Sequence, residues 1–517
     1  MNDKENQKMR KPSLRIFLGC LACTLLLLFR HGYTFGSGDQ SEMLPYAKYL
    51  IDNQLYPSDF YIQSIASWVP NERYAFSSFM SLFGDKMDWA AFGLHFGATM
   101  LLILGLYRLA KEGLDTEGGR WLAVLMPVMV LYGVNLGGNE LYYNAFLPSY
   151  VAQVMGVWVF VFAIRGEALP TYVLLMLMTY VHPLIGVQLW LLINLSFLTM
   201  RVLGKNAVNL ISLLVFNALY LFTAAFFIYK IKTGFDAGSV NNQQFLDIIR
   251  FRAAHHYFPD AFPLKNWLIL ALPFYIGWRV AGDTFRYIFR WIVAGVVVYM
   301  VGIYIFKNPT PLSMQWFSTM VWIKMFSFMI SFTLIKKLMD KSYLYEMLFK
   351  PKHLILNTLI ALSLLSVIFM MPQFRLLKNK DYDFPFFKTE SPEVNISKLA
   401  KEKTSPDALF LILSDLSEFR YWSERSSYVD YKATNHRQAA FVEWYNRIQQ
   451  VYKISLEDRL KGYHLTQLAN YHFQELRTED FKKFAKNQHI THIVTYKNVD
   501  LKFKRIAEND TYVIYKL

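Results

Sequence analysis

The feature that most constrains this chain is a series of apolar blocks, each long enough to cross about 30 Å of hydrocarbon. Apolar residues make up 54% of the sequence and charged residues only 18%, which excludes an ordinary soluble protein. The sequence therefore predicts a polytopic α-helical membrane protein of about eleven transmembrane helices. The predicted spans lie near residues 14–30, 88–108, 120–136, 149–164, 170–182, 184–203, 207–230, 266–281, 286–306, 316–335 and 353–371. The boundary within 170–203 is open, because two shorter spans meet at His182-Pro183.

Positive charge predicts the orientation of these spans, because short cytoplasmic loops are enriched in Lys and Arg. The N-terminus is basic and is expected in the cytoplasm, and the first span lacks a small-residue cleavage site, so we expect an uncleaved anchor. With an odd number of spans, the C-terminal domain lies outside. Alternate loops carry the expected charges: Arg108, Lys111 and Arg120; Arg165; Arg201 and Lys205; Arg279, Arg286 and Arg290; and Lys336, Lys337, Lys341, Lys350 and Lys352.

One outer loop, residues 231–265, breaks this charge rule. It carries Lys232, Arg250, Arg252 and Lys265 on the side where positive charge is disfavoured. Either this loop binds an anionic ligand or the predicted topology is wrong. The net charge of +15 is otherwise accounted for by the cytoplasmic loops and the tail, so it requires no nucleic-acid partner.

The composition changes after the last predicted span and indicates a second domain. Residues 1–371 form the predicted membrane domain, 372–404 an interfacial linker and 405–517 a small soluble α/β domain. Strands are expected at 408–415, 489–496 and 511–517, with helices at 437–452 and 464–487. No phosphate loop or nucleophile elbow occurs there, so an accessory role is expected. Both cysteines lie in the first span, which leaves the tail without a disulfide or a cysteine zinc site.

The long first outer loop, residues 31–87, carries the principal catalytic candidate. Asp39 follows the first span within GSGDQ, where flanking glycines permit close approach of a ligand. A carboxylate at this place could accept the proton of an acceptor hydroxyl during glycosyl transfer. The alternative is a helix cap, in which Asp39 or Ser41 would begin the helix QSEMLPYAKYLID.

Glu140, in GGNELYYNAF, is a second acidic candidate on an outer loop without basic residues. Two outer-loop carboxylates could hold a divalent cation such as Mg²⁺ or Mn²⁺ through hard oxygen ligands. Neither loop contains an Asp-x-Asp pair, however, and a surface turn at Gly-Gly-Asn is the alternative.

The segment RFRAAHHYFPDAFP, residues 250–263, is the principal candidate for binding phosphate. Arginine suits phosphate because its forked donors match the oxygens, and His255 and His256 could add hydrogen bonds to a phosphate or sugar. The alternative is an amphipathic segment that lies on the membrane. Three further candidates are His182 beside a broken helix, Lys324 deep in its span, and Arg73 in the first outer loop, each with an ordinary packing or snorkelling alternative.

The layout resembles the GT-C glycosyltransferase superfamily. The stretches GDQSEMLPYAKYLIDNQLYPSDFY, RFRAAHHYFPDAFPL and FRYWSERSSYVDYKA also resemble an uncharacterised bacterial family of multi-spanning proteins. The resemblance implies an inner-membrane location, Asp39 as the catalytic residue and Glu42 or Glu140 as a second acid. It also implies a polyprenyl-phosphate-linked sugar donor and an envelope glycan, lipid or protein acceptor. This chain departs from the superfamily because it lacks paired first-loop acids, which puts a metal-dependent mechanism in doubt.

A membrane protein without catalytic activity, either a transporter or a scaffold for envelope biogenesis, is the alternative. A transporter is expected to show inverted repeats with charges in matched halves, and no such repeat is found. A scaffold would not need the Asp39 carboxylate, so this residue separates the two hypotheses.

Overall fold

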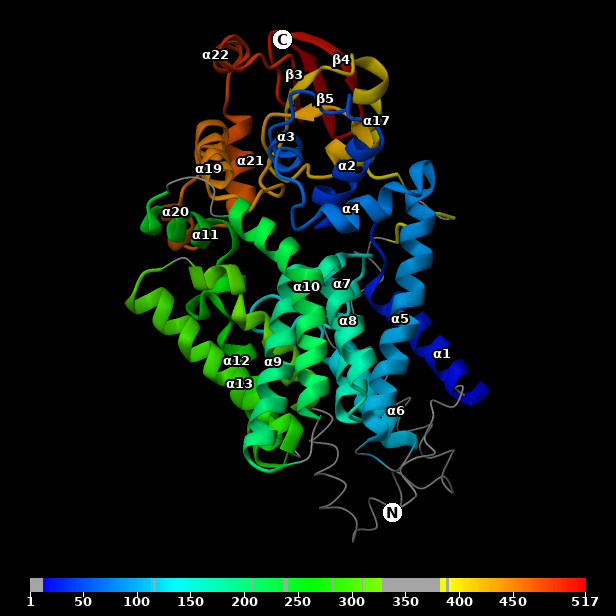
Figure 1. Cartoon of the computed structure of the whole chain (residues 1–517). Coiled ribbons are helices and arrows are strands. Elements are labelled where there is room, and N and C mark those ends of the chain that lie inside the picture. Colours follow the sequence, from blue (N-terminus) through cyan, green and yellow to red (C-terminus); the bar gives the residue numbers. More distant parts are fainter. Residues whose placement is uncertain are drawn as a thin grey trace.

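The computed structural model describes residues 13–112, 114, 117–205, 209–235, 240–280, 283–308, 310–327, 382–386 and 390–517. Within these ranges a bundle of apolar helices forms one end of the molecule and a small sheet domain forms the other (Figure 1). The predicted span at 353–371 and the last part of that at 316–335 lie outside the described residues.

Within the described residues, the bundle contains helices that overlap the first nine predicted spans. Five segments of the described chain are long and apolar enough to cross a membrane: Leu14–His31, Gly84–Lys111, Pro183–Val202, Leu210–Gly234 and Arg286–Ile305. The helices are α1 (Leu14–His31), α5 (Met87–Lys111), α6 (Glu117–Leu125), α7 (Pro148–Ile164), α8 (Ala168–Val181), α9 (Pro183–Val202), α10 (Leu210–Phe235), α12 (Leu264–Val280) and α13 (Asp283–Met300). The described residues thus support a multi-spanning membrane protein without establishing eleven spans.

The open boundary at His182 is a break between two helices. α8 ends at Val181 and α9 begins at Pro183, because proline lacks an N–H but fits the first position of a helix. His182 has an extended backbone, and its Nδ1 accepts a hydrogen bond from the N–H of Ile185 at 3.4 Å. His182 is therefore the N-cap of α9.

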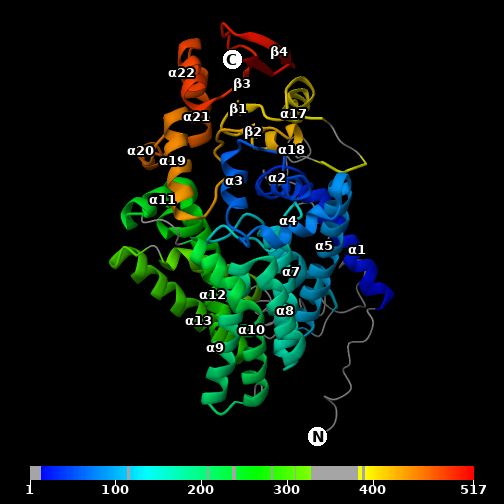
Figure 2. The same ribbon diagram turned by 45° about the horizontal axis from the view of Figure 1, so that its top comes forward.

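The segment predicted to be the first outer loop, residues 31–87, forms three short helices between the bundle and the C-terminal domain: α2 (Gln40–Ile51), α3 (Phe60–Ala66) and α4 (Tyr74–Ser81). α2 packs against α4 and against α18 (Phe419–Ser423) of the C-terminal domain. Figure 2 shows these helices where the two parts of the molecule meet. The loop therefore connects the membrane helices to the C-terminal domain.

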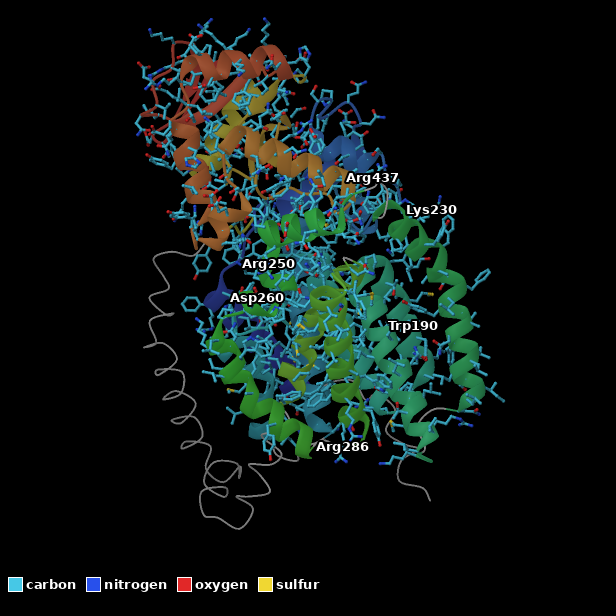
Figure 3. The ribbon with its side chains drawn as sticks, turned by 90° about the vertical axis from the view of Figure 1, so that its left-hand side faces the viewer. Trp190, Lys230, Arg250, Asp260, Arg286 and Arg437 are labelled. Carbon is cyan, nitrogen blue, oxygen red and sulfur yellow. The ribbon has the colours of Figure 1, made fainter. Side chains whose placement is uncertain are left out.

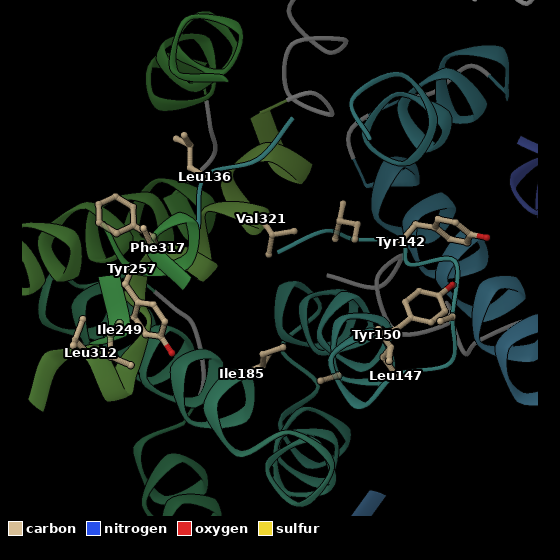
Figure 4. Close-up of a cluster of buried hydrophobic side chains, with 14 of the residues drawn as sticks. Leu136, Tyr142, Leu147, Tyr150, Ile185, Ile249, Tyr257, Leu312, Phe317 and Val321 are labelled. Carbon is tan, nitrogen blue, oxygen red and sulfur yellow. The ribbon is translucent and has the colours of Figure 1, made fainter. Parts of the chain in front are cut away.

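A further helix, α11 (Asn242–Tyr257), contains the first part of the segment 250–263, with both of its arginines and both of its histidines. Its backbone is kinked at Ala253, where φ is −145° and ψ is 41°. α11 contacts α19 (Gln438–Tyr452) and α20 (Leu456–Leu460) of the C-terminal domain. Figure 4 shows the apolar cluster nearby, in which Ile249 and Tyr257 of α11 lie near Ile185 of α9 and Phe317. This packing fixes α11 to the bundle.

The C-terminal domain contains a five-stranded sheet in the order β2-β1-β3-β5-β4. β1 runs parallel to β2 and β3, whereas β5 is antiparallel to β3 and β4. The strands are β1 (Leu409–Leu411), β2 (Ser426–Ser427), β3 (His492–Tyr496), β4 (Lys504–Glu508) and β5 (Tyr512–Lys516), and the remaining helices are α17 (Pro392–Lys403), α21 (Leu465–Gln474) and α22 (Thr478–Gln488). The three predicted strand regions each contain a strand.

Two details of this domain differ from the sequence prediction. Helix α17 lies within the predicted linker and packs against β4 and β5, so the packed domain begins before residue 405. The predicted helix at 464–487 is interrupted, because α21 ends at Gln474 and α22 begins at Thr478.

A buried ion triad holds the first outer loop against the C-terminal domain. Arg420 donates from Nε to Asp59 at 2.6 Å and from Nη1 to Asp430. The Arg420 side chain is 1% exposed, and both carboxylates are 0% exposed. Asp59 also accepts the N–H of Ser427 at 2.8 Å. The triad thus joins distant segments of the chain, since Arg420 and Asp59 lie 361 residues apart in the sequence.

Candidate functional site

Asp39 lies at the N-cap position of α2, but its side chain makes no capping hydrogen bond. Its Oδ1 instead accepts a hydrogen bond from Nζ of Lys432, a residue of the C-terminal domain. Ser41 does not cap the helix through an N–H either, because its hydroxyl donates to the carbonyl of Gly38 at 2.7 Å. The capping alternative therefore does not account for the Asp39 carboxylate.

The Asp39 carboxylate is accessible to solvent and strongly acidic. The side chain is 47% exposed, and that of Lys432 is 31% exposed. Burial by the surrounding protein opposes ionisation, but Lys432, His256 and Arg252 more than offset it and lower the pKa of Asp39 to about 2. Asp39 is thus a carboxylate at neutral pH in a strongly positive environment.

Arg252 and His256 of α11 interact with Asp39, and His255 contacts His256. Arg252 donates from Nη2 to the carbonyl of Lys432 at 2.8 Å and approaches Oε1 of Glu42 at 4.0 Å. Nδ1 of His256 lies 3.1 Å from the carbonyl of Gly137, and the ring of His255 contacts that of His256 with centroids 4.1 Å apart. We call Asp39, Arg252, His255, His256 and Lys432 the Asp39 cluster.

The Asp39 cluster has an excess of positive charge. The pKa of His255 shows the effect of this charge. Burial lowers the pKa of the imidazole, and His256, Arg252, Arg459 and Lys432 lower it further, to about 3. Nε of Arg252 is buried and has no hydrogen-bond partner among the described residues. An unsatisfied buried donor is costly, so an anion that accepts a hydrogen bond from it would be stabilised there.

Arg250 is separate from this cluster. Its Nη1 lies 2.6 Å from Oδ2 of Asp260, and its guanidinium lies over the ring of Phe258 at 4.4 Å. Figure 3 shows Arg250 and Asp260 together near the boundary between the bundle and the C-terminal domain. Both arginines precede the kink at Ala253, so the kink does not separate them. Their side chains point in different directions because residues two apart on a helix do not share a face.

Arg73 and Glu42 form a second, more buried group next to the Asp39 cluster. Arg73 is 5% exposed and donates to Glu42 and, at 2.6 Å, to Oε1 of Glu72. Glu72 also contacts Nδ1 of His436 at 3.1 Å. Burial opposes ionisation of Glu72, but Arg73 and His436 lower its pKa to about 2. His182 instead caps α9 through the N–H of Ile185.

Glu140 and Lys324 are each other's partners. Nζ of Lys324 lies 2.7 Å from Oε2 of Glu140 and also donates to the carbonyl of Leu131 at 2.7 Å. Glu140 accepts further hydrogen bonds from the N–H of Gly133 and from the side chain of Asn135. A phosphate ligand for Lys324, or a metal ligand role for Glu140, would require this buried pair to open.

The acidic residues do not fit a divalent cation. Within the described residues no group of three or more His, Cys, Asp or Glu side chains is arranged to hold a metal ion. Asp39 is bonded to Lys432, Glu42 to Arg73 and Glu140 to Lys324. Because each carboxylate is directed at a cationic side chain, the arrangement gives no support to an Mg²⁺ or Mn²⁺ site.

Sequence reasoning missed the contribution of the C-terminal domain to this site. Lys432, His436 and Arg459 come from that domain, where only an accessory role was expected. Lys432 lies 393 residues from Asp39 in the sequence. No periodicity or spacing brings such distant residues together, so only the folded arrangement identifies them.

We expect Gly138→Ala to impair both stability and the site. Gly138 has φ +75°, and a Cβ added there would overlap the ring of His256. Gly133→Ala is the matched control, because φ is +80° but nothing lies within 4 Å of the added atom. Both substitutions cost about 1–2 kcal/mol of backbone strain, and the overlap adds roughly 1–3 kcal/mol. Melting temperatures of the two purified variants measure the difference, and equal values would contradict the contact with His256.

Comparisons with known proteins identify a matched segment and similar solved structures. A family model described as a domain of unknown function, DUF6798, matches residues 392–451. This segment contains Arg420, Asp430 and Lys432. The apo crystal structure of the Archaeoglobus fulgidus oligosaccharyltransferase is similar with 11% identity and a TM-score of 0.46, over 94% of this chain and 70% of that chain. No curated protein matches this sequence. A likeness at this level assigns neither fold nor activity to this chain.

Proposed function

We propose that this protein is a membrane glycosyltransferase that moves a sugar from a polyprenyl-phosphate-linked donor to an envelope glycan, lipid or protein. The observation that carries the proposal is the Asp39 cluster, in which a solvent-accessible carboxylate lies beside Arg252, His256 and Lys432. The cluster lies where α2 and α11 meet the C-terminal domain, at one end of the apolar bundle (Figure 1). Such a place suits a donor whose lipid lies in the membrane and whose phosphate lies at its surface.

The proposed reaction follows from these charges. Asp39 accepts the proton of the acceptor hydroxyl, whose oxygen forms a bond to the anomeric carbon of the sugar. The bond between that carbon and the phosphate oxygen breaks, and its electron pair leaves with polyprenyl phosphate. Arg252, Lys432 and the imidazoles of His255 and His256 bind the phosphate and stabilise its charge. The reaction as written involves no electron transfer, and none of its steps uses a metal ion.

The proposed topology places the Asp39 cluster outside the bacterial inner membrane. The end of the bundle that carries Arg286 lies away from the C-terminal domain in Figure 3, and Arg286 belongs to a predicted cytoplasmic loop. With the N-terminus in the cytoplasm, the first outer loop and the C-terminal domain are extracytoplasmic. In this arrangement the C-terminal domain contributes to the site and also helps to define where the acceptor binds.

A non-catalytic scaffold is the second candidate, and the Asp39–Lys432 ion pair is the observation that favours it. This pair joins the first outer loop to the C-terminal domain, as do the Asp59–Arg420 pair and the pair of Lys48 with Glu424 at 2.6 Å. In a scaffold, Asp39 would serve only as one more such contact.

A mass-spectrometric profile of envelope glycans and glycolipids separates the two functions. It compares cells that lack this protein with the same cells complemented by the wild-type chain. The transferase proposal expects the deletion to remove a discrete sugar mass and complementation to restore it. A deletion that changes no glycan or glycolipid would contradict the proposal.

A further inference from the structure

The side chain of Lys432 differs from its backbone in how firmly it is held. Its N–H donates to Oδ1 of Asp430 at 2.6 Å, and its carbonyl accepts from Arg252 at 2.8 Å. Asp430 is itself bonded to the buried Arg420. The side chain, by contrast, is 31% exposed and is bonded at its end to the carboxylate of Asp39. Its Nζ is therefore less constrained than its backbone.

The Asp39–Lys432 pair is incompatible with the role proposed for Asp39. A general base works best when its pKa is near the operating pH. Lys432 is the nearest cation to Asp39 and the principal reason, against the effect of burial, that the pKa of Asp39 lies at about 2. While this pair is intact, Asp39 is a weak proton acceptor.

The surroundings of Lys432 are rich in positive charge. Arg252 donates to the carbonyl of Lys432 and lies over the ring of Tyr431, and Arg459 donates to the hydroxyl of Tyr431 and to the carbonyl of Phe251. Arg252 in addition has a buried donor, Nε, without a partner among the described residues. A phosphate group has several acceptor oxygens and forms strong charge-assisted hydrogen bonds with such donors.

We propose that Lys432 exchanges partners, from Asp39 in the unliganded protein to the phosphate of a bound donor. The proposal rests on the function proposed above and adds the residue that couples donor binding to the base. No covalent bond changes in this step. Once the ammonium group has moved to the phosphate, Asp39 is free to accept the hydroxyl proton. Asp39 thus becomes available as a base only when a donor is bound.

A double-mutant cycle tests the exchange. The affinity of the detergent-solubilised full chain for dodecyl phosphate is measured for the wild type, Asp39→Asn, Lys432→Met and the double variant. Lys432→Met is expected to weaken binding about tenfold or more, because a charge-assisted hydrogen bond is lost. Asp39→Asn is expected to tighten binding roughly two- to fivefold, because Lys432 no longer has to leave a carboxylate.

The decisive comparison is the effect of Asp39→Asn with and without Lys432. If Lys432 moves to the phosphate, the tightening is larger in the chain that retains Lys432. If Lys432 stays on Asp39, it screens the carboxylate from the phosphate, and the tightening is equal or larger in the Lys432→Met background. That second result would overturn the exchange and leave the proposed function standing. Lys461→Met, which removes an exposed lysine paired with Glu457 on α20, is the control and should not change the affinity.

Two further binding measurements, with dodecanol and with inorganic phosphate, identify the source of the phosphate. Dodecanol, which lacks the phosphate, should not compete with dodecyl phosphate, and inorganic phosphate should bind much more weakly than the lipid. Equal affinity for inorganic phosphate would overturn the lipid-linked donor. No saturable binding of dodecyl phosphate by the wild type would overturn both the donor class and the exchange. Melting temperatures of all variants within a few degrees of the wild type establish that the affinities refer to folded protein.

Discussion

Asp39→Asn should lower the rate of sugar transfer by about two to four orders of magnitude, the usual contribution of a general base. The amide has nearly the shape of the carboxylate but cannot accept the proton of the acceptor hydroxyl. Stability should change little, because Asp39 and Lys432 are partly exposed and pairs of this kind contribute about 0–1 kcal/mol. A large loss of rate with an unchanged melting temperature would therefore reflect chemistry.

Asp260→Asn is the matched control for this variant. Asp260 is also an acidic residue outside the predicted spans and is also paired with an arginine, Arg250, but it lies outside the Asp39 cluster. Initial rates are measured with each purified variant added to membranes of cells that lack the protein. We expect Asp260→Asn to retain most of the wild-type rate. Equal rates for the two variants would refute the catalytic assignment of Asp39.

Arg420→Met should destabilise the protein strongly. It leaves Asp59 and Asp430 buried without their cationic partner, and breaking a buried pair in this way costs about 3–5 kcal/mol. Asp59 also accepts the N–H of Ile62 at 3.0 Å and so caps α3. The first outer loop and the C-terminal domain should therefore separate more readily. Thermal melting of the detergent-solubilised chain measures the loss.

Lys48→Met is the control, because Lys48 also joins the first outer loop to the C-terminal domain. Lys48 and Glu424 are 21% and 18% exposed, so we expect a loss of about 1 kcal/mol or less. Adding Asp59→Asn and Asp430→Asn to Arg420→Met should recover part of the stability, since the unpaired buried charges are removed. Melting of Arg420→Met at the same temperature as Lys48→Met would contradict the role of the triad.

Several elements could be predicted because their signals are local. The predicted loop at 31–87 contains α2, α3 and α4, which are all shorter than the candidate spans. Pro183 marked the break between α8 and α9. Apolar runs predicted β1, β3 and β5, which are buried in the sheet. Each of these predictions depended on residues within about one element of each other.

The missed elements carried weaker or misleading signals. β4 is an edge strand with three exposed charged residues, Lys504, Arg505 and Glu508, so its sequence lacks an apolar pattern. α17 was assigned to a linker because aromatic and proline residues precede it. Its sequence does contain a helix start, however: Ser391 caps the N–H of Val394, and Pro392 occupies the first turn.

The candidate site was only half predictable, because its parts come from three distant segments. The acidic first loop and the basic α11 segment each stood out by composition, and the structure brings Asp39, Arg252, His255 and His256 together. The sequence could not show which charged residues pair with each other. The partners of Asp39 and Lys324 lie 393 and 184 residues away. Charge alone did not distinguish Lys324, which is neutralised by Glu140, from Lys432, which lies at the site.

Transfer of a sugar from a lipid phosphate by the Asp39 cluster can be followed in membranes. Membranes of cells that lack the protein should contain both unused donor and unmodified acceptor, so purified protein is added to them and the lipids are followed by mass spectrometry. We expect the wild-type chain to convert polyprenyl-phosphate-linked sugar to polyprenyl phosphate while an acceptor gains the mass of that sugar, and Asp39→Asn to leave both unchanged. An unchanged donor after addition of the wild type, or equal conversion by Asp39→Asn, would contradict transfer by the Asp39 cluster.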